Sequence, residues 1–122
     1  EPWHVKKLNK GKLMALYHFT ADYSGEAFIG MVSSTQDRES AARKLIEAVG
    51  MKLHNFYFCV NTGQIISMIE GTGTQMSTLD MVIMASGAFT CVEAKEVISA
   101  SEMTSSMEAA NKVMSKYKAP NQ

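Results

Sequence analysis

The sequence contains no long hydrophobic run and only two cysteines. No apolar stretch approaches the roughly 18 residues needed to span a membrane, so we expect no membrane association. The first four residues, Glu1-Pro2-Trp3-His4, lack the hydrophobic core of a signal peptide. The lone thiols, Cys59 and Cys91, are typical of small buried side chains in a reduced protein, with a disulfide between them as the alternative. These features together predict a cytoplasmic location.

An excess of charge of either sign is also absent, because 12 basic residues balance 12 acidic ones. The balance is uneven, since residues 1–12 carry Lys6, Lys7, Lys10 and Lys12 against Glu1 alone, and the remainder is slightly acidic. Nucleic-acid binding requires a basic surface that neutralises phosphates, so we expect no nucleic-acid partner. The lysine-rich start is expected to be a solvated extension, and contact with an anionic polymer is the alternative.

Common catalytic motifs are missing as well. There is no Gly-x-Ser-x-Gly and no phosphate-binding glycine loop, and no set of ligands for a metal stands out. The segment 71–74, Gly-Thr-Gly-Thr, precedes a predicted helix and could hold an anion there, although no lysine is near it in sequence. We therefore expect no cofactor and no metal, and the sequence leaves open whether the protein is an enzyme.

What the sequence does contain is a regular alternation of strand and helix signals. Strands are predicted from dense aromatic and β-branched residues, and helices from apolar positions at helical spacing that follow a hydroxyl-to-acid start. The expected strands are 13–20, 51–60, 64–70 and 88–99; the expected helices are 26–32, 38–49, 77–86 and 105–117. We expect one domain over residues 14–117, with residues 1–13 as an extension before a plausible start at Met14 and residues 118–122 as a tail.

The order β-α-β-β-α-β-α predicts an α+β fold. Both crossover helices can lie on one face of a four-stranded antiparallel sheet, which leaves the other face bare. Alternate residues of a strand point to opposite faces, and in residues 53–60 both sets are largely apolar. Leaving such side chains exposed costs about 1.5–3 kcal/mol each relative to burial. The sequence therefore predicts a homodimer or a higher oligomer.

Several segments resemble the GYD-domain family. Residues 50–60, Gly-Met-Lys-Leu-His-Asn-Phe-Tyr-Phe-Cys-Val, are similar to its Gly-Gly-Lys-Leu-x-Gly-Phe-Tyr strand, and residues 36–45 and 84–92 are similar to its first helix and its approach to the last strand. The resemblance spans roughly residues 14–114 and implies a ferredoxin-like fold that pairs as a dimeric α+β barrel. At the family's Gly-Glu-Tyr-Asp motif this chain has Asn61-Thr62-Gly63-Gln64, so no family active-site residue is carried over.

Five polar and aromatic residues in the predicted strands are candidate ligand contacts. They have the mixed apolar and polar character of a pocket lining between sheet and helices, and simple core packing is the alternative. The five residues are Tyr17, His18, His54, Asn55 and Tyr57. The two histidines could bind a metal or act as acid and base, but no acidic residue is apparent at a matching strand position.

Two functions follow as expectations. One is binding of a small hydrophobic or aromatic molecule in a barrel pocket, with a cofactor-free enzyme as an extension of it. The other is a non-catalytic, homo-oligomeric assembly module. Ten methionines are present, and those in or beside predicted helices fit either core filling or adaptable contact surfaces. These are Met76, Met81, Met84, Met103, Met107 and Met114.

Overall fold

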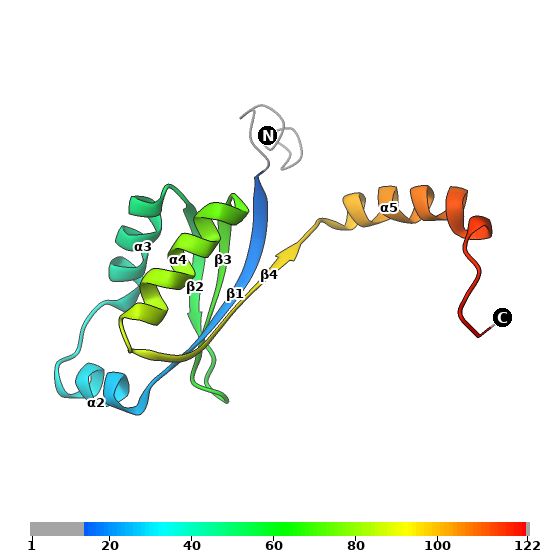
Figure 1. Ribbon diagram of the computed structural model, residues 1–122. Coiled ribbons are helices and arrows are strands. Elements are labelled where there is room, and N and C mark those ends of the chain that lie inside the picture. The colour runs from blue at the N-terminus through cyan, green and yellow to red at the C-terminus, as the bar shows by residue number, and fades with distance from the viewer. Residues whose placement is uncertain (1–13, 122) are drawn as a thin grey trace.

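The computed structural model describes residues 14–121, so the expected extension over residues 1–13, with its lysines, lies outside the described part of the chain. The elements follow the predicted order, with a short 3-10 helix added at the end (Figure 1). The strands are β1 (Ala15–Tyr23), β2 (Lys52–Phe58), β3 (Gln64–Gly71) and β4 (Phe89–Val97). The helices are α2 (Gly25–Ser33), α3 (Arg38–Val49), α4 (Gly73–Ala85), α5 (Ala100–Val113) and η1 (Met114–Lys116).

The four strands form one antiparallel sheet in the order β2-β3-β1-β4. Helices α3 and α4 lie beside each other across one face of this sheet, and α2 lies near one end of the strands (Figure 1). The two crossovers, β1 to β2 and β3 to β4, thus place their main helices on the same face. This is a ferredoxin-like α+β fold, as the element order predicted.

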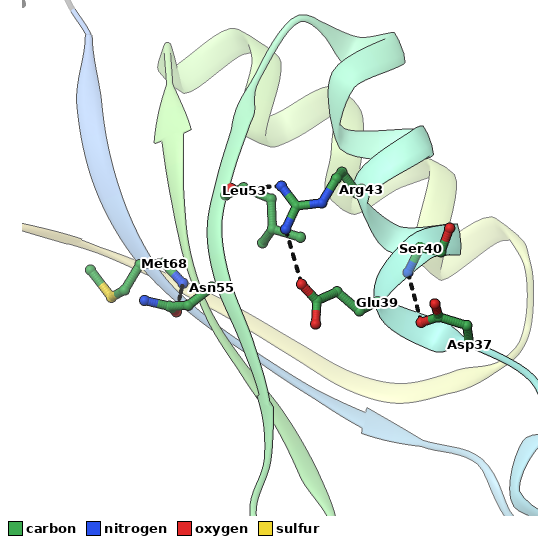
Figure 2. A network of polar contacts seen from close by, with 7 residues as sticks. All are labelled: Asp37, Glu39, Ser40, Arg43, Leu53, Asn55 and Met68. Atoms are coloured by element: carbon green, nitrogen blue, oxygen red, sulfur yellow. Dashed lines mark hydrogen bonds and ion pairs between the residues drawn. The ribbon is translucent and has the colours of Figure 1, made fainter.

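Helix α3 begins and ends where its sequence indicates. The carboxylate of Asp37 accepts a hydrogen bond of 3.1 Å from the Ser40 amide, which satisfies one of the free N–H groups of the first turn (Figure 2). The helix stops at Gly50, whose φ of 96° lies in the left-handed region that a side chain would disfavour. Arg43 then ties α3 to the sheet, because it donates a 3.1 Å hydrogen bond to the Leu53 carbonyl.

The core fills the space between the sheet and helices α3 and α4. Alternate residues of β1 and β3 point into it, so Phe19 lies next to Ser67 across the strand pair and Ile69 is fully buried. Ile46 of α3 and Leu79 of α4 pack against them. Burial of each such side chain contributes about 1.5–3 kcal/mol, so this layer is the main source of stability.

Strand β2 departs from simple alternation. A bulge between Leu53 and Asn55 shifts the register, so that Leu53 and Phe56 pair with the core residues of β3 while Asn55 and Tyr57 face the opposite side. The Asn55 side-chain oxygen accepts a 3.1 Å hydrogen bond from the Met68 amide, within the shifted register (Figure 2). Strict alternation over residues 53–60 would place Leu53, Asn55 and Tyr57 on one face, and the strand does not follow it because the bulge adds one residue.

Two helices begin earlier than predicted. The α4 capping box uses Thr72 and Gln75 rather than a start at residue 77, so the segment 71–74 becomes the N-cap and first turn. The α5 capping box uses Ser99 and Glu102, six residues before the predicted pair of residues 105 and 108. In both observed capping boxes a hydroxyl side chain lies three residues before Gln or Glu. The predicted starts were similar, with a hydroxyl three residues before an acidic residue.

The outer surface of the molecule carries more apolar area than expected. Apolar residues nearly encircle helix α4, a pattern that predicts burial on several sides, yet Met81 is 70% exposed and Met84 is 46% exposed. The two cysteines are free thiols rather than a disulfide, and neither is fully buried. Among residues 14–121, none of the helices combines the length and the apolarity needed to cross a bilayer.

Helix α5 projects away from the sheet beyond the end of β4 (Figure 1). None of its residues is buried. Its exposed methionines continue along one side at helical spacing, in an apolar stripe formed by Met103, Met107, Ala110 and Met114. A helix of this length is only marginally stable alone in water, so a stripe that no other element of residues 14–121 covers needs an explanation.

Candidate functional site

A small cavity lies in the core layer, between the sheet and helices α3 and α4. Its volume is about 90 Å³, and its walls are mainly aromatic and aliphatic side chains from all four strands and both helices. The lining includes Phe19, Ala42, Leu45, Phe56, Ile69 and Leu79. This mostly apolar, partly enclosed space is smaller than the usual ligand pocket of about 300–1,000 Å³, so by itself it has room only for a small apolar group.

A wider cleft continues from this cavity toward helix α2. It measures about 440 Å³ and is formed by Phe28, Met31 and Val32 of α2 together with Phe58 of β2. Cavity and cleft share the lining residues Tyr23, Arg38, Phe56 and Ile65. The two hollows therefore adjoin each other, and together they mark a path from the protein surface toward the core.

Aromatic rings build the wall at the end of the strands next to this path. Tyr23 stacks on Phe89 at 4.9 Å between ring centroids and meets Phe28 edge-on at 5.5 Å. Phe28 in turn meets Phe58 edge-on at 6.2 Å. These contacts bring together β1, β4, α2 and β2, and such geometries contribute about 0.5–1.5 kcal/mol each beyond area burial. The wall is thus a connected aromatic surface.

Among the described residues, Arg38 is the only charged side chain that lines both hollows. It is the first residue of α3, and its Nη1 donates a 2.7 Å hydrogen bond to Gln36 Oε1. Its Nε is buried and has no hydrogen-bond partner among residues 14–121. A buried donor without a partner costs about 1–3 kcal/mol or more, so this nitrogen is suited to an acceptor from outside the chain.

The five residues predicted as ligand contacts lie elsewhere. His18, Asn55 and Tyr57 face away from α3 and α4, on the sheet side that we call the open face, and Tyr57 is 64% exposed there. Tyr17 points to the helix side, with its hydroxyl near the start of α4 at Gly73. None of the five lines the cavity or the cleft.

Tyr17 and His54 each occupy a distinct polar environment. Burial, and secondarily the negative charge of Glu96, raises the pKa of the Tyr17 hydroxyl. His54 Nε2 lies 2.8 Å from Glu70 Oε1, and the Glu70 side chain is 2% exposed. The expectation that no acid matches the histidines is therefore wrong for His54, because the bulge brings it beside Glu70. Among the described residues, no three histidine, cysteine, aspartate or glutamate side chains cluster as metal ligands.

Sequence reasoning missed Arg38 as a site residue. As a charged residue of the helix predicted over residues 38–49, Arg38 is expected, with Glu39 and Arg43, on the face opposite the apolar positions. A signal was present, because Arg38, Ala42 and Leu45 are spaced by four and three residues and so share a helix face. All three line the cavity.

Asp80 of α4 carries a second buried, unpartnered atom, its Oδ1, within the described residues. Burial raises the pKa of this carboxyl, so the folded chain holds the proton more tightly than the unfolded chain does. The protonated Asp80 carboxyl therefore contributes fully to the stability of the fold at pH values below its pKa in the unfolded chain, about 4. This contribution is lost as the pH rises through the higher pKa of the carboxyl in the folded chain.

We expect Asp80→Asn to raise the free energy of unfolding at pH 7, because the substitution removes a charge that folding desolvates. The difference from the unmodified chain should vanish near pH 3.5, where Asp80 is protonated in both states. Urea unfolding at the two pH values measures this. Glu93→Gln, at a side chain that is 57% exposed, is the control and should change little. An equal gain at both pH values would contradict the pH argument.

Comparison of the chain with family models, with curated proteins and with solved structures found no match in any of the three. The functional assignment therefore depends on the geometry of the cavity, the cleft and the exposed apolar surfaces.

Proposed function

We propose that this protein is a GYD-like domain that binds a small hydrophobic or aromatic molecule in the cavity and cleft beneath α3. The observation that carries the proposal is the path from the surface into the core, lined by apolar side chains and by a single charged one. Binding sites combine a mainly apolar lining with a few polar groups that fix orientation. Arg38, Tyr23 and Ser67 are the polar groups available here. Free thiols fit the reducing cytoplasm as its location.

The proposal is tested by mapping where a probe binds. In a titration with 3-phenylpropanoate followed by amide chemical shifts, the largest changes should occur at cavity residues such as Phe19, Ala42 and Phe56. Residues of the open face, such as His18 and Tyr57, should change little. Changes confined to the open face would instead favour the five strand residues as the site and would contradict the cavity proposal.

A second candidate function is homo-oligomeric assembly, and two exposed apolar surfaces favour it. The open face carries the half-buried apolar side chains Leu16, Ile66 and Met68, without cover from α3 or α4 and beside polar ones such as His18 and Lys95. The α5 stripe, defined above, is likewise uncovered. Contiguous apolar patches of this kind on a small domain usually mark contacts with another protein.

A second copy of the chain is the proposed occupant of both surfaces. A two-fold pair can bury the same patch on each copy, and a projecting helix can be exchanged between them. Light scattering on the full chain tests this, with twice the 13.4 kDa chain mass expected. A mass of one chain at micromolar concentration would contradict the proposal. Assembly and ligand binding are compatible, because the cavity lies on the helix side of the sheet.

A further inference from the structure

We infer that the ligand of the cavity is a monocarboxylate with a short apolar or aromatic tail, and that Arg38 binds its carboxylate. This inference rests on the proposed binding function and adds the chemical class of the ligand. It depends on three observations: the state of the Arg38 guanidinium, the absence of an acidic partner for it, and the character of the surrounding walls.

The guanidinium has one edge in use and one edge available. Nη1 is held by Gln36, whereas Nε is buried without a partner among the described residues. In arginine, the Nε–H and one Nη2–H point the same way and form a two-pronged donor. Two parallel hydrogen bonds from this edge match the two oxygens of a carboxylate. Gln36 leaves that edge unpaired and limits the rotation of the group; because Nε is buried, a ligand oxygen reaches it only where a covering side chain moves aside.

No carboxylate of the chain neutralises Arg38 within residues 14–121. The neighbouring Glu39 pairs with Arg43 instead, at 3.0 Å (Figure 2). Arginine stays charged at any physiological pH. The Arg38 guanidinium, at the edge of an apolar cavity, therefore keeps a positive charge that a ligand anion can compensate. The attraction between the two charges is stronger there than in water.

The side chains that line the cavity and the cleft limit the charge and the size of the rest of the ligand. Apart from Arg38, no charged residue among residues 14–121 lines the cavity or the cleft, so one anionic group is matched and a second would be buried unpaired. The enclosed part, about 90 Å³, is smaller than the roughly 150 Å³ that encloses a benzene ring. A short chain or the edge of one ring fits there, and the aromatic cleft covers the remainder.

The test compares 3-phenylpropanoate with its neutral isostere 3-phenylpropanamide by calorimetry. We expect the carboxylate to bind the unmodified protein about tenfold to a hundredfold more tightly than the amide. In Arg38→Gln, carboxylate affinity should fall to that of the amide, while amide affinity changes less than threefold. Arg38→Lys, which keeps the charge and loses the two-pronged edge, should be intermediate.

Arg43→Gln is the matched control, because it removes the same charge from the next turn of α3 but at a side chain outside the lining. It should leave the preference for the carboxylate unchanged. Equal binding of both probes to the unmodified protein, or equal losses in both arginine variants, would overturn the inference and leave the proposed function standing. If neither probe bound, both would be overturned. Circular dichroism shows whether each variant is folded. If Arg38→Gln unfolds, the inference is tested by the preference of Arg38→Lys for the carboxylate over the amide.

Discussion

Replacement of both Met103 and Met107 by glutamate is expected to convert an associated protein into a monomer. The two methionines are 52% and 55% exposed in the single chain and lie on the α5 stripe. In a two-fold pair the exposed half of four side chains would be buried, each contributing about 0.7–1.5 kcal/mol. The loss of about 3–6 kcal/mol would weaken association by about two to four orders of magnitude. Sedimentation equilibrium at micromolar concentration measures the change.

The control adds the same charges to the other side of the same helix. Ser101→Glu with Ser105→Glu places two carboxylates off the stripe, at exposed positions. This variant should keep the mass of the unmodified protein. If both double variants dissociate alike, net charge rather than the stripe controls association. If the Met103 and Met107 variant keeps the associated mass, α5 is not part of the contact.

The second large effect is expected from filling the cavity. Ala42→Leu adds three carbon atoms at a lining position, in a space of about 90 Å³. Because packed side chains leave no room for a ligand, binding of 3-phenylpropanoate should fall by at least a hundredfold. The free energy of unfolding should stay the same or rise by about 0.5–2 kcal/mol, since filling a void adds contacts. Calorimetry and urea unfolding give the two quantities.

Ala48→Leu is the control on the same helix. Ala48 is exposed and lines neither hollow, so the same substitution there should leave binding unchanged. Unaltered binding in Ala42→Leu would place the ligand outside the cavity. A loss of stability greater than about 3 kcal/mol would instead mean that the space is too small to accept the leucine.

Much of the fold could be predicted because its signals are local. The periodicity of residues 38–49, the stop at Gly50 and the turn near Gly63 each depend on neighbours in the chain, and the structure confirms them. The starts of α4 and α5 were misplaced because several hydroxyl-to-acid pairs compete there. Which pair caps a helix depends on where the preceding strand leaves the sheet.

The candidate site was harder to predict because it depends on register. His18, Asn55 and Tyr57 were chosen for their chemistry, yet the bulge at residues 53–55 and the strand pairing place them on the open face. Arg38 looked like an ordinary surface charge of an amphipathic helix. Only the packing of α3 over β1 and β2 places it beside Phe56 and the cleft.

By itself the sequence determined the order of strands and helices and the antiparallel sheet, because hydrophobic periodicity and turn residues act over a few neighbours. The tertiary structure alone decided which side chains share a face, where a void remains and which helix is left uncovered. Those properties depend on distances between residues far apart in the chain, and these distances follow from strand register and packing rather than from local pattern.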